Sequence, residues 1–575
     1  MYKTLKKYHE YLMIRKFWFI LFIVTTTISV VIDFSTPYFS KLFIDKIQAN
    51  NLNGVLSLLF LYLAIMIVGN IFGNIKNFSG DISAVDGVKK LKLDVFKQIQ
   101  DLDFAYHTQR NTGSLISAFK RGENAFWDLY DRFYSRVYPV IVGFVILVWY
   151  FLRIDYRIIV IFIVSAIITL IITKTLLPLN IKRRKAVNDK EDEISGIITD
   201  NLINYETVKL FAKEDWEQNR LDKELSDWKK IIWKYFVTYR YIDTALGNLI
   251  NLGVFLVLFM SFNLVSGKTI GLSDFVLIIS AVSLFFPQLF NMVYSIRQIS
   301  QGYADIKKYL DILDEEVQIK DPANATILDH VKGDINFKNI SFAYKSSRGS
   351  AVKNINLKIP AGKSIAFVGR SGVGKTTLVR LLMRFYDPTN GKITIDGINI
   401  KDFTKSNLRS FMGVVPQEPI LFNNTIRYNI EYGAEKSTTL NEVERAAKIA
   451  HIDGFINSLP EKYKTEVGER GVKLSGGQKQ RLAIARMILS NPDIIIFDEA
   501  TSQLDSESEK LIQDAFWKAA KGKTTIIIAH RLSTIMKADE IIVMEKGRIV
   551  ERDSHKNLLA RKDSLYSKFW NLQQS

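Results

Sequence analysis

The stretch LSGGQKQRLAIARMILSNPDIIIFDEATSQLD, residues Leu474–Asp505, decides the fold of the C-terminal part of the chain. Its apolar run Ile494–Phe497 has no polar break and is followed at once by Asp498 and Glu499. Such a run is typical of a strand buried on both faces of a parallel sheet. The carboxyl ends of such strands face the ligand crevice, so we expect both acids there. One carboxylate can hold Mg²⁺ while its neighbour polarises an attacking water.

The beginning of the same stretch predicts a helix N-terminus suited to a phosphate. Ser475, Gly476, Gly477 and Gln478 leave backbone N–H groups uncovered where the helix begins. The helix dipole favours an anion at that end. An ordinary helix start fits this turn equally well, and acidic pairs are common in proteins. Whether this helix start binds a phosphate, and whether the acidic pair is catalytic, therefore depends on the rest of the chain.

Composition narrows the class of protein. The chain has 575 residues, enough for several domains, and a formal net charge of +18. This charge fits a protein that handles polyphosphate near an anionic membrane surface. Nucleic acid is the rival partner, but no arginine-rich tail or zinc-ligand set supports it. The chain has no cysteine, which excludes disulfides and thiolate metal sites.

Six apolar runs near the length needed to cross a membrane as a helix lie before residue 300. They are Phe17–Tyr38, Val55–Ile75, Val137–Leu152, Ile158–Leu177, Ala245–Val265 and Leu272–Ile296. The third run is short, and we expect it to extend back toward Phe133. The sequence therefore predicts an all-α domain with six transmembrane helices.

Two long polar stretches, Lys76–Arg136 and Pro178–Asp243, separate these spans into pairs. Both are rich in Lys and Arg, which indicates a cytoplasmic location. Gly and Pro are sparse in them, so we expect the spans to continue as long helices that reverse at a short tip. The candidate tips are Phe104–Ser117 and Asn204–Trp216.

After Ile312 the sequence becomes acidic and irregular, and beyond it short strand and helix patterns alternate. We therefore divide the chain into a membrane domain (residues 1–312), a linker (313–330) and an α/β domain (331–575). In the last part, GRSGVGKT matches the P-loop pattern between a predicted strand and a predicted helix. Backbone N–H groups of a P-loop cradle phosphates, its lysine neutralises them and its hydroxyl reaches Mg²⁺. The predicted nucleotide-binding residues here are Gly369, Arg370, Ser371, Gly372, Val373, Gly374, Lys375, Thr376 and Thr377.

Four further residues lie where they can complete such a site. Tyr344 follows a predicted strand and can stack on adenine, although a core tyrosine fits its position too. Gln417 follows another strand and can reach Mg²⁺ or the attacking water. His530 comes after the apolar run TTIIIA and can contact a γ-phosphate, whereas a lone histidine is more often structural. Asp505 ends the SQLD turn just beyond the acids.

These motifs, in this order and spacing, resemble the ATP-binding cassette (ABC) transporters. The six spans with two long loops resemble an exporter-type half-transporter. The resemblance implies ATP and Mg²⁺ as ligands, with Thr376, Gln417 and Asp498 at the metal. It further implies Walker A at Gly369–Thr376, Walker B at Ile494–Asp498 with Glu499 as catalytic base, the signature at Leu474–Gln478, the A-loop at Tyr344, the Q-loop at Gln417 and the switch histidine at His530.

The resemblance also implies a paired mechanism. In this family two cassettes dock head to tail, and each supplies its signature to the γ-phosphate on the other. This chain has one copy of each motif, so we expect a second half-transporter as partner, in a homodimer. ATP binding and hydrolysis would then drive alternating access. We expect a multi-pass protein of the cell membrane, with lipid around its spans, a cytoplasmic cassette and no nucleic acid.

The substrate stays open at this stage. Polar residues follow one face of the sixth span and one of the fifth, and Asp33 is the most isolated acid of an apolar run. Such groups line cavities or join helices by hydrogen bonds. Residues 204–211, NYETVKLF, are similar to a segment of mitochondrial iron–sulfur-linked exporters, but the fifth span lacks a clear match to their thiol-peptide site. Lipid, hydrophobic drug and peptide remain candidates. The polar positions are Gln288, Asn291, Ser295 and Gln298, and Thr244, Asn248 and Asn251.

Two other classes share parts of this pattern. A soluble chromosome-maintenance ATPase carries a P-loop and an LSGGQ segment, but six spans argue against it. A nucleotide-gated channel can use the same scaffold and the same motifs. Ion currents, measured against ATP-driven uptake into vesicles, would separate a channel from an exporter.

Overall fold

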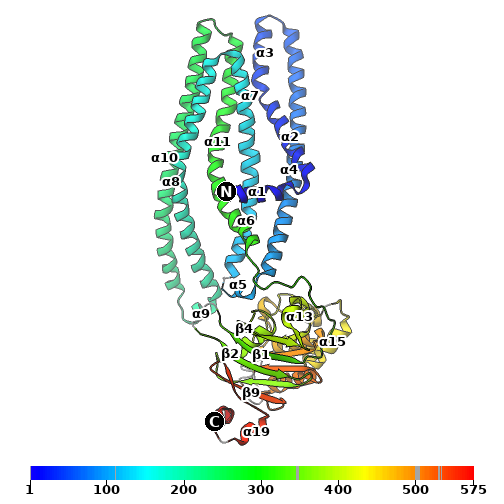
Figure 1. Cartoon of the computed structure of the whole chain (residues 1–575). Helices are drawn as coiled ribbons and strands as arrows, with labels where there is room; N and C mark the ends of the chain where they lie inside the picture. The colour runs from blue at the N-terminus through cyan, green and yellow to red at the C-terminus, as the bar shows by residue number, and fades with distance from the viewer. Residues whose placement is uncertain are drawn as a thin grey trace. The chain divides into compact units, whose positions relative to one another are not determined.

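The computed structural model describes residues 2–109, 112–344, 349–434, 436–498, 506–528, 531, 534–561 and 563–574. The chain forms two compact units, which Figure 1 colours by residue number. The helical unit comprises Met1–Leu102 and Arg110–Glu316, and the α/β unit comprises Asp103–Gln109 and Val317–Ser575. The second division falls inside the predicted linker.

Long helices build the helical unit because its apolar runs continue into polar sequence without helix breakers. Within the described residues, six helices are long and apolar enough to cross a membrane, which confirms the six predicted spans. α4 and α10 contain 50 and 53 residues, so each extends for about 75–80 Å. The helices are α1 (Tyr2–Leu12), α2 (Lys16–Asp33), α3 (Thr36–Gln48), α4 (Leu52–Asp101), α6 (Thr112–Tyr130), α7 (Tyr138–Ile154), α8 (Tyr156–Ile203), α9 (Tyr205–Leu210), α10 (Glu214–Ser266) and α11 (Leu272–Asp311).

The third span begins earlier than its apolar run. A seven-residue π-helix, Asp131–Val137, joins α6 to α7, so helical backbone continues through the position where the apolar run starts. π-helical segments are rare and occur often at functional sites. A second irregularity separates α2 from α3, where Pro37 lies in the first turn of α3. Proline suits that turn because the N–H it lacks would have no partner there.

The interior of the helical unit is aromatic and aliphatic. Phe162, Phe285 and Phe286 are fully buried, and the ring of Phe162 packs 5.1 Å from that of Phe285. By contrast, α4 presents Leu59, Phe60 and other large apolar side chains on its surface. A protein in water rarely exposes so much contiguous apolar surface. A lipid environment for this helix follows.

Sheets and short helices form the α/β unit. Its described strands make a six-stranded sheet in the order β10-β9-β3-β8-β7-β6 and a four-stranded sheet in the order β2-β1-β4-β5. In the larger sheet β9, β3, β8, β7 and β6 run parallel, and β10 is antiparallel to β9. The strands are β1 (Ile335–Phe342), β2 (Val352–Ile359), β3 (Ser364–Val368), β4 (Asn390–Ile395), β5 (Ile398–Asn399), β6 (Met412–Val415), β7 (Ile494–Asp498), β8 (Thr524–Ile528), β9 (Glu540–Glu545) and β10 (Arg548–Asp553).

The buried run Ile494–Phe497 is strand β7, as predicted, with β6 and β8 paired on either side. Its position explains its composition, because a strand covered on both faces needs apolar side chains on both. Helices pack around the sheet and complete two hydrophobic cores. They are α12 (Lys375–Leu382), α13 (Lys405–Ser410), α14 (Ile426–Glu431), α15 (Leu440–Ile449), α16 (Asp453–Ser458), α17 (Gly476–Ser490), α18 (Ser506–Ala520), α19 (His555–Ala560) and α20 (Leu565–Gln574).

Candidate nucleotide-binding site

Glycines shape the loop between β3 and α12. Gly372 and Gly374 have φ angles of +80° and +106°, in the left-handed region that favours glycine. A Cβ on Gly374 would lie 2.6 Å from the carbonyl oxygen of Ala351, and one on Gly369 would lie 2.4 Å from that of Met544. Neither position has room for a side chain. The glycines therefore let the loop backbone lie close to the neighbouring chain segments. With no side chains at these positions, the loop N–H groups stay accessible to a phosphate.

Lys375 begins α12 and is nearly buried, with 5% of its surface exposed. Its ammonium donates hydrogen bonds to the carbonyl oxygens of Gly369 (2.6 Å) and Arg370 (3.1 Å). The charge is thus held at the centre of the glycine loop. A fixed cation at that position can neutralise the β- and γ-phosphates of a nucleotide.

One cavity of about 850 Å³ brings together ten of the predicted residues of this unit. Its volume suits a ligand of nucleotide size. Beyond the prediction, Lys546 and Gly547, which follow β9, also line it. The predicted residues that line it are Tyr344, Arg370, Ser371, Gly372, Val373, Gly374, Lys375, Thr376, Thr377 and Gln417.

Aromatic neighbours orient Tyr344 at one side of the cavity. Its ring meets Phe342 and Tyr386 edge-on, with centroids 5.0 Å and 5.3 Å away. Its hydroxyl lies 3.2 Å from the Thr377 hydroxyl of α12. A ring held in this way, beside the first turn of the P-loop helix, is chemically suited to stack on a purine.

Gln417 follows β6 and is tied to helix α17 through its backbone. The buried Gln480 side chain donates a hydrogen bond to the carbonyl oxygen of Gln417 at 2.6 Å. Sequence reasoning missed Gln480, because nothing local distinguishes it from the other polar residues of α17. This hydrogen bond joins the segment that carries Gln417 to the helix that carries the LSGGQ motif.

The LSGGQ motif lies at the beginning of α17. The Ser475 hydroxyl accepts a hydrogen bond from the backbone N–H of Gln478, and the Gln478 side chain accepts one from the N–H of Ser475. This reciprocal pair is a capping box, which fixes the start of the helix. Ser475 and Gly476 are exposed, and neither is among the described residues that line the 850 Å³ cavity.

The acidic part of the predicted site is described as far as Asp498, the last residue of β7. Glu499, Asp505 and His530 lie outside the described residues. Hydroxyl, amide and carboxylate oxygens are the ligands that Mg²⁺ prefers, so Thr376, Gln417 and Asp498 fit a magnesium site. The described residues contain no group of three or more His, Cys, Asp or Glu side chains that could hold a metal ion.

Helix α5 (Phe104–Gln109) packs in the α/β unit although its residues belong to the first long loop. The Phe104 ring stacks on Phe385 with centroids 4.7 Å apart, and the guanidinium of Arg380 lies 5.5 Å above it. Tyr386, the next residue, contacts both Phe104 and Tyr344 edge-on. A row of aromatic rings therefore connects this predicted tip with the nucleotide cavity.

Asp103 ties the segment before α5 to the linker. Its carboxylate accepts hydrogen bonds from the backbone N–H groups of Gln318 (2.7 Å) and Ile319 (3.1 Å). The nearly buried Arg384 holds the next part of the linker, donating to the carbonyl oxygen of Lys320 at 3.0 Å. Sequence reasoning predicted a tip here but gave no signal for either partner.

A P-loop cavity in an α/β unit, joined in one chain to a unit of six membrane-spanning helices, defines a membrane ATPase of the cassette class. Comparison with known proteins makes the assignment specific. The sequence model described as "ABC transporter transmembrane region" matches residues 19–289, and that described as "ABC transporter" matches residues 352–502. The chain belongs to the ABC transporter family. The predicted resemblance, fold class, multi-pass topology and class of ATPase are confirmed.

Several relatives extend the match over most of the chain. ABC transporter B family member 6 of Dictyostelium discoideum is 37% identical over 535 residues, 90% of this chain and 78% of that protein. The ATM1-type heavy metal exporter of Novosphingobium aromaticivorans is 35% identical over 505 residues, 87% of this chain and 82% of that protein. Heavy metal tolerance factor 1 of Caenorhabditis elegans is 37% identical over 490 residues, and the match spans 60% of its length.

A solved structure of a bacterial Atm1-family ABC exporter with ATP bound is similar over 98% of this chain and 99% of its own. Its TM-score is 0.87 at 31% sequence identity. One membrane region followed by one cassette is the arrangement of an exporter-type half-transporter, as predicted.

Proposed function

We propose that this protein is an ATP-driven exporter that works as a homodimer by alternating access. The observation that carries the proposal is that Tyr344, the P-loop and Gln417 line one cavity. The chain that contains this cavity belongs to the ABC transporter family. ATP is the substrate of the cassette. Two chains would form two equivalent sites, because each chain has every motif that hydrolysis requires.

Each residue has a defined task in the proposed hydrolysis. Tyr344 stacks on adenine, and the N–H groups of the glycine loop together with Lys375 hold the phosphates. Thr376, Gln417 and Asp498 would hold Mg²⁺, which would supply positive charge to neutralise the phosphates. Glu499 accepts a proton from the attacking water, and His530 contacts the γ-phosphate. Asp505 and the signature residues Ser475–Gln478 complete the site on the other chain.

Two exposed surfaces support pairing. Ser475 and Gly476 present an uncovered helix start, which suits a phosphate held by a second chain. The second predicted tip, around α9, exposes apolar side chains, with Leu210 and Phe211 about 70% exposed or more. Apolar side chains exposed together on a surface usually mark a contact with another protein surface. We propose that it docks on the cassette of the second chain near Gln417.

This docking predicts a specific cross-link. The protein has no native cysteine, so Lys213→Cys on one chain and Glu418→Cys on another, both exposed, can be tested without background. Oxidation of co-expressed, differently tagged chains is expected to give a covalent dimer and to block transport. Lys213→Cys paired with the exposed Lys556→Cys is the matched control. A link that forms only within one chain, or full transport with the link in place, would contradict the docking.

The first tip gives a second prediction. Phe104→Ala removes a ring stack worth about 0.5–1.5 kcal/mol beyond its buried area. We expect transport by the reconstituted protein to fall about fivefold or more, while ATP affinity changes little, because the ring lies outside the nucleotide cavity. Thr108→Ala, an exposed change on the same helix, is the control. Normal transport by the Phe104 variant would show that α5 is not needed to couple ATP hydrolysis to transport.

The relatives named for heavy metals suggest the nature of the cargo. The chain has no cysteine, and its described residues hold no cluster of metal-ligating acids or histidines. A soft metal ion would thus lack thiolate ligands from this chain. We propose that any metal leaves as a complex, recognised through its organic ligand; a thiol-peptide is one such ligand.

Transport is tested with the protein in inside-out vesicles of the cell membrane, its proposed location. ATP-dependent accumulation of a labelled solute inside the vesicles is the expected result. Ionic currents that need nucleotide but no hydrolysis would replace the exporter with a gated channel. Absence of ATP hydrolysis until a different polypeptide is added would contradict the homodimer.

A further inference from the structure

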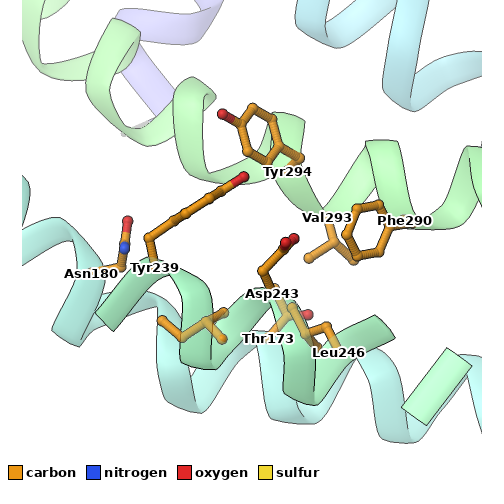
Figure 2. A pocket seen from close by; sticks show the side chains of 9 residues that line it. Thr173, Asn180, Tyr239, Asp243, Leu246, Phe290, Val293 and Tyr294 are labelled. Carbon is orange, nitrogen blue, oxygen red and sulfur yellow. The ribbon is translucent and has the colours of Figure 1, made fainter. Parts of the chain in front are cut away.

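Two cavities within the helical unit differ in what they can hold. Figure 2 shows the first, where α8, α10 and α11 meet, with Asp243 beside Val293. Its volume of about 40 Å³ has room for only a few waters. The second has about 210 Å³ and is lined by α2, α4, the π-helix, α7 and α11. Of these two cavities, the second is the one large enough for part of a solute.

The larger cavity is charged. Asp33, Lys76 and Arg136 line it, together with the amide side chains of Gln288 and Asn291. Among the described residues, the side chains of Asp33 and Lys76 have no hydrogen-bond or salt-bridge partner. Arg136 lies 3.7 Å from Asp131, and about half of its side chain is exposed. The lining thus has two cations, one carboxylate and two amides, and of its three charged groups Arg136 is the one paired with a described residue.

All five of these residues lie in the helices that are long and apolar enough to cross a membrane. Charged side chains in such segments are costly, and they are usually found where they line a polar pathway. The π-helix supplies Arg136, in the kind of rare segment that often occurs at functional sites. Four separate elements supply the polar groups, so no single amphipathic helix explains the cluster.

We propose that this cavity binds the anionic group, a carboxylate or a phosphate, of the exported solute. Lys76 and Arg136 donate charge-assisted hydrogen bonds to it, and Gln288 and Asn291 add neutral ones. Asp33 sets the charge preference: the residues that line the cavity include one acid and two cations, so a single negative charge on the ligand balances the lining. The inference rests on the proposed function and narrows its substrate to anionic solutes.

A size-matched series of phenyl compounds tests the proposal on the full chain in liposomes. The probes are phenylpropionate (one negative charge), phenyl phosphate (two), phenylalanine (net neutral) and phenylpropylamine (one positive charge). The readout is the concentration that half-maximally changes ATP hydrolysis, with the shift in melting temperature as a second measure. We expect phenylpropionate to act at a concentration roughly tenfold lower than phenylpropylamine.

Charge variants separate the roles of the residues. Lys76→Gln should abolish the preference for the anion, and Asp33→Asn should shift it toward phenyl phosphate. The double variant has the net charge of the wild type and should regain the wild-type order. Lys174→Gln and Asp45→Asn, charged positions of the helical unit outside the cavity, should leave the order unchanged.

An unchanged order in all variants, or no response to either anion, would overturn the proposal. A stronger response to phenyl phosphate than to phenylpropionate in the wild type would keep the anion site but overturn the preference for a single charge. Absence of basal ATP hydrolysis and transport in the wild type would instead overturn the proposed function. The two failures are thus distinguishable.

Discussion

Glu499→Gln is expected to slow ATP hydrolysis by at least about 100-fold while ATP still binds, because a positioned general base typically contributes about 10²–10⁴ in rate. In the sequence Glu499 directly follows Asp498, the last residue of the buried strand β7, so we expect its carboxylate at the carboxyl edge of the parallel strands. Glutamine has nearly the same shape but cannot accept the proton. The measurement is steady-state ATP turnover of the purified protein, beside nucleotide binding at equilibrium. We expect the variant to accumulate as a closed dimer with ATP.

Glu545→Gln is the matched control for this experiment. Glu545 ends β9 and lines the 850 Å³ nucleotide cavity, but no hydrolytic role is assigned to it. The substitution removes one negative charge from the nucleotide cavity, as Glu499→Gln removes one from the chain, and it is expected to keep turnover within a few-fold of the wild type. Near-normal turnover in the Glu499 variant would show that another group is the base.

The features predicted well from sequence are those with local physical causes. An unbroken β-branched run becomes the central strand β7 because only apolar side chains tolerate burial on both faces. Glycines at positive φ mark the loop around Gly374, and a hydroxyl followed by glycines begins α17. Six apolar runs become six long helices because backbone polar groups inside lipid must pair within their own segment.

Contacts between residues far apart in the sequence could not be predicted. The stack of Phe104 on Phe385 joins residues about 280 positions apart, and no periodicity encodes such a pair. Asp33, Gln288 and Asn291 were singled out as polar exceptions, but their meeting with Lys76 and Arg136 depends on how four elements pack. The π-helix was missed for a related reason, since one extra residue per turn changes no composition.

Lys375→Ala is expected to weaken nucleotide binding itself, in contrast to the Glu499 variant. The Lys375 ammonium is nearly buried and held by two carbonyl oxygens of its own loop, so little of its charge is screened by water. Loss of a charge-assisted contact to phosphate costs about 1.5–3 kcal/mol, or roughly 10–100-fold in Kd. Equilibrium binding of a labelled ATP analogue, with and without Mg²⁺, measures it.

The control for Lys375 comes from the same cavity. Lys546 also lines it, but it follows β9 rather than beginning the P-loop helix, so Lys546→Ala tests whether any nearby cation suffices. If general electrostatic attraction held the nucleotide, both variants would lose similar affinity, and both losses would diminish together with added salt. If the fixed position of Lys375 within the glycine loop is what matters, its variant alone should lose most of the affinity at every salt concentration. Equal affinity of the Lys375 variant and the wild type would contradict the assignment of Gly369–Thr376 as the phosphate loop.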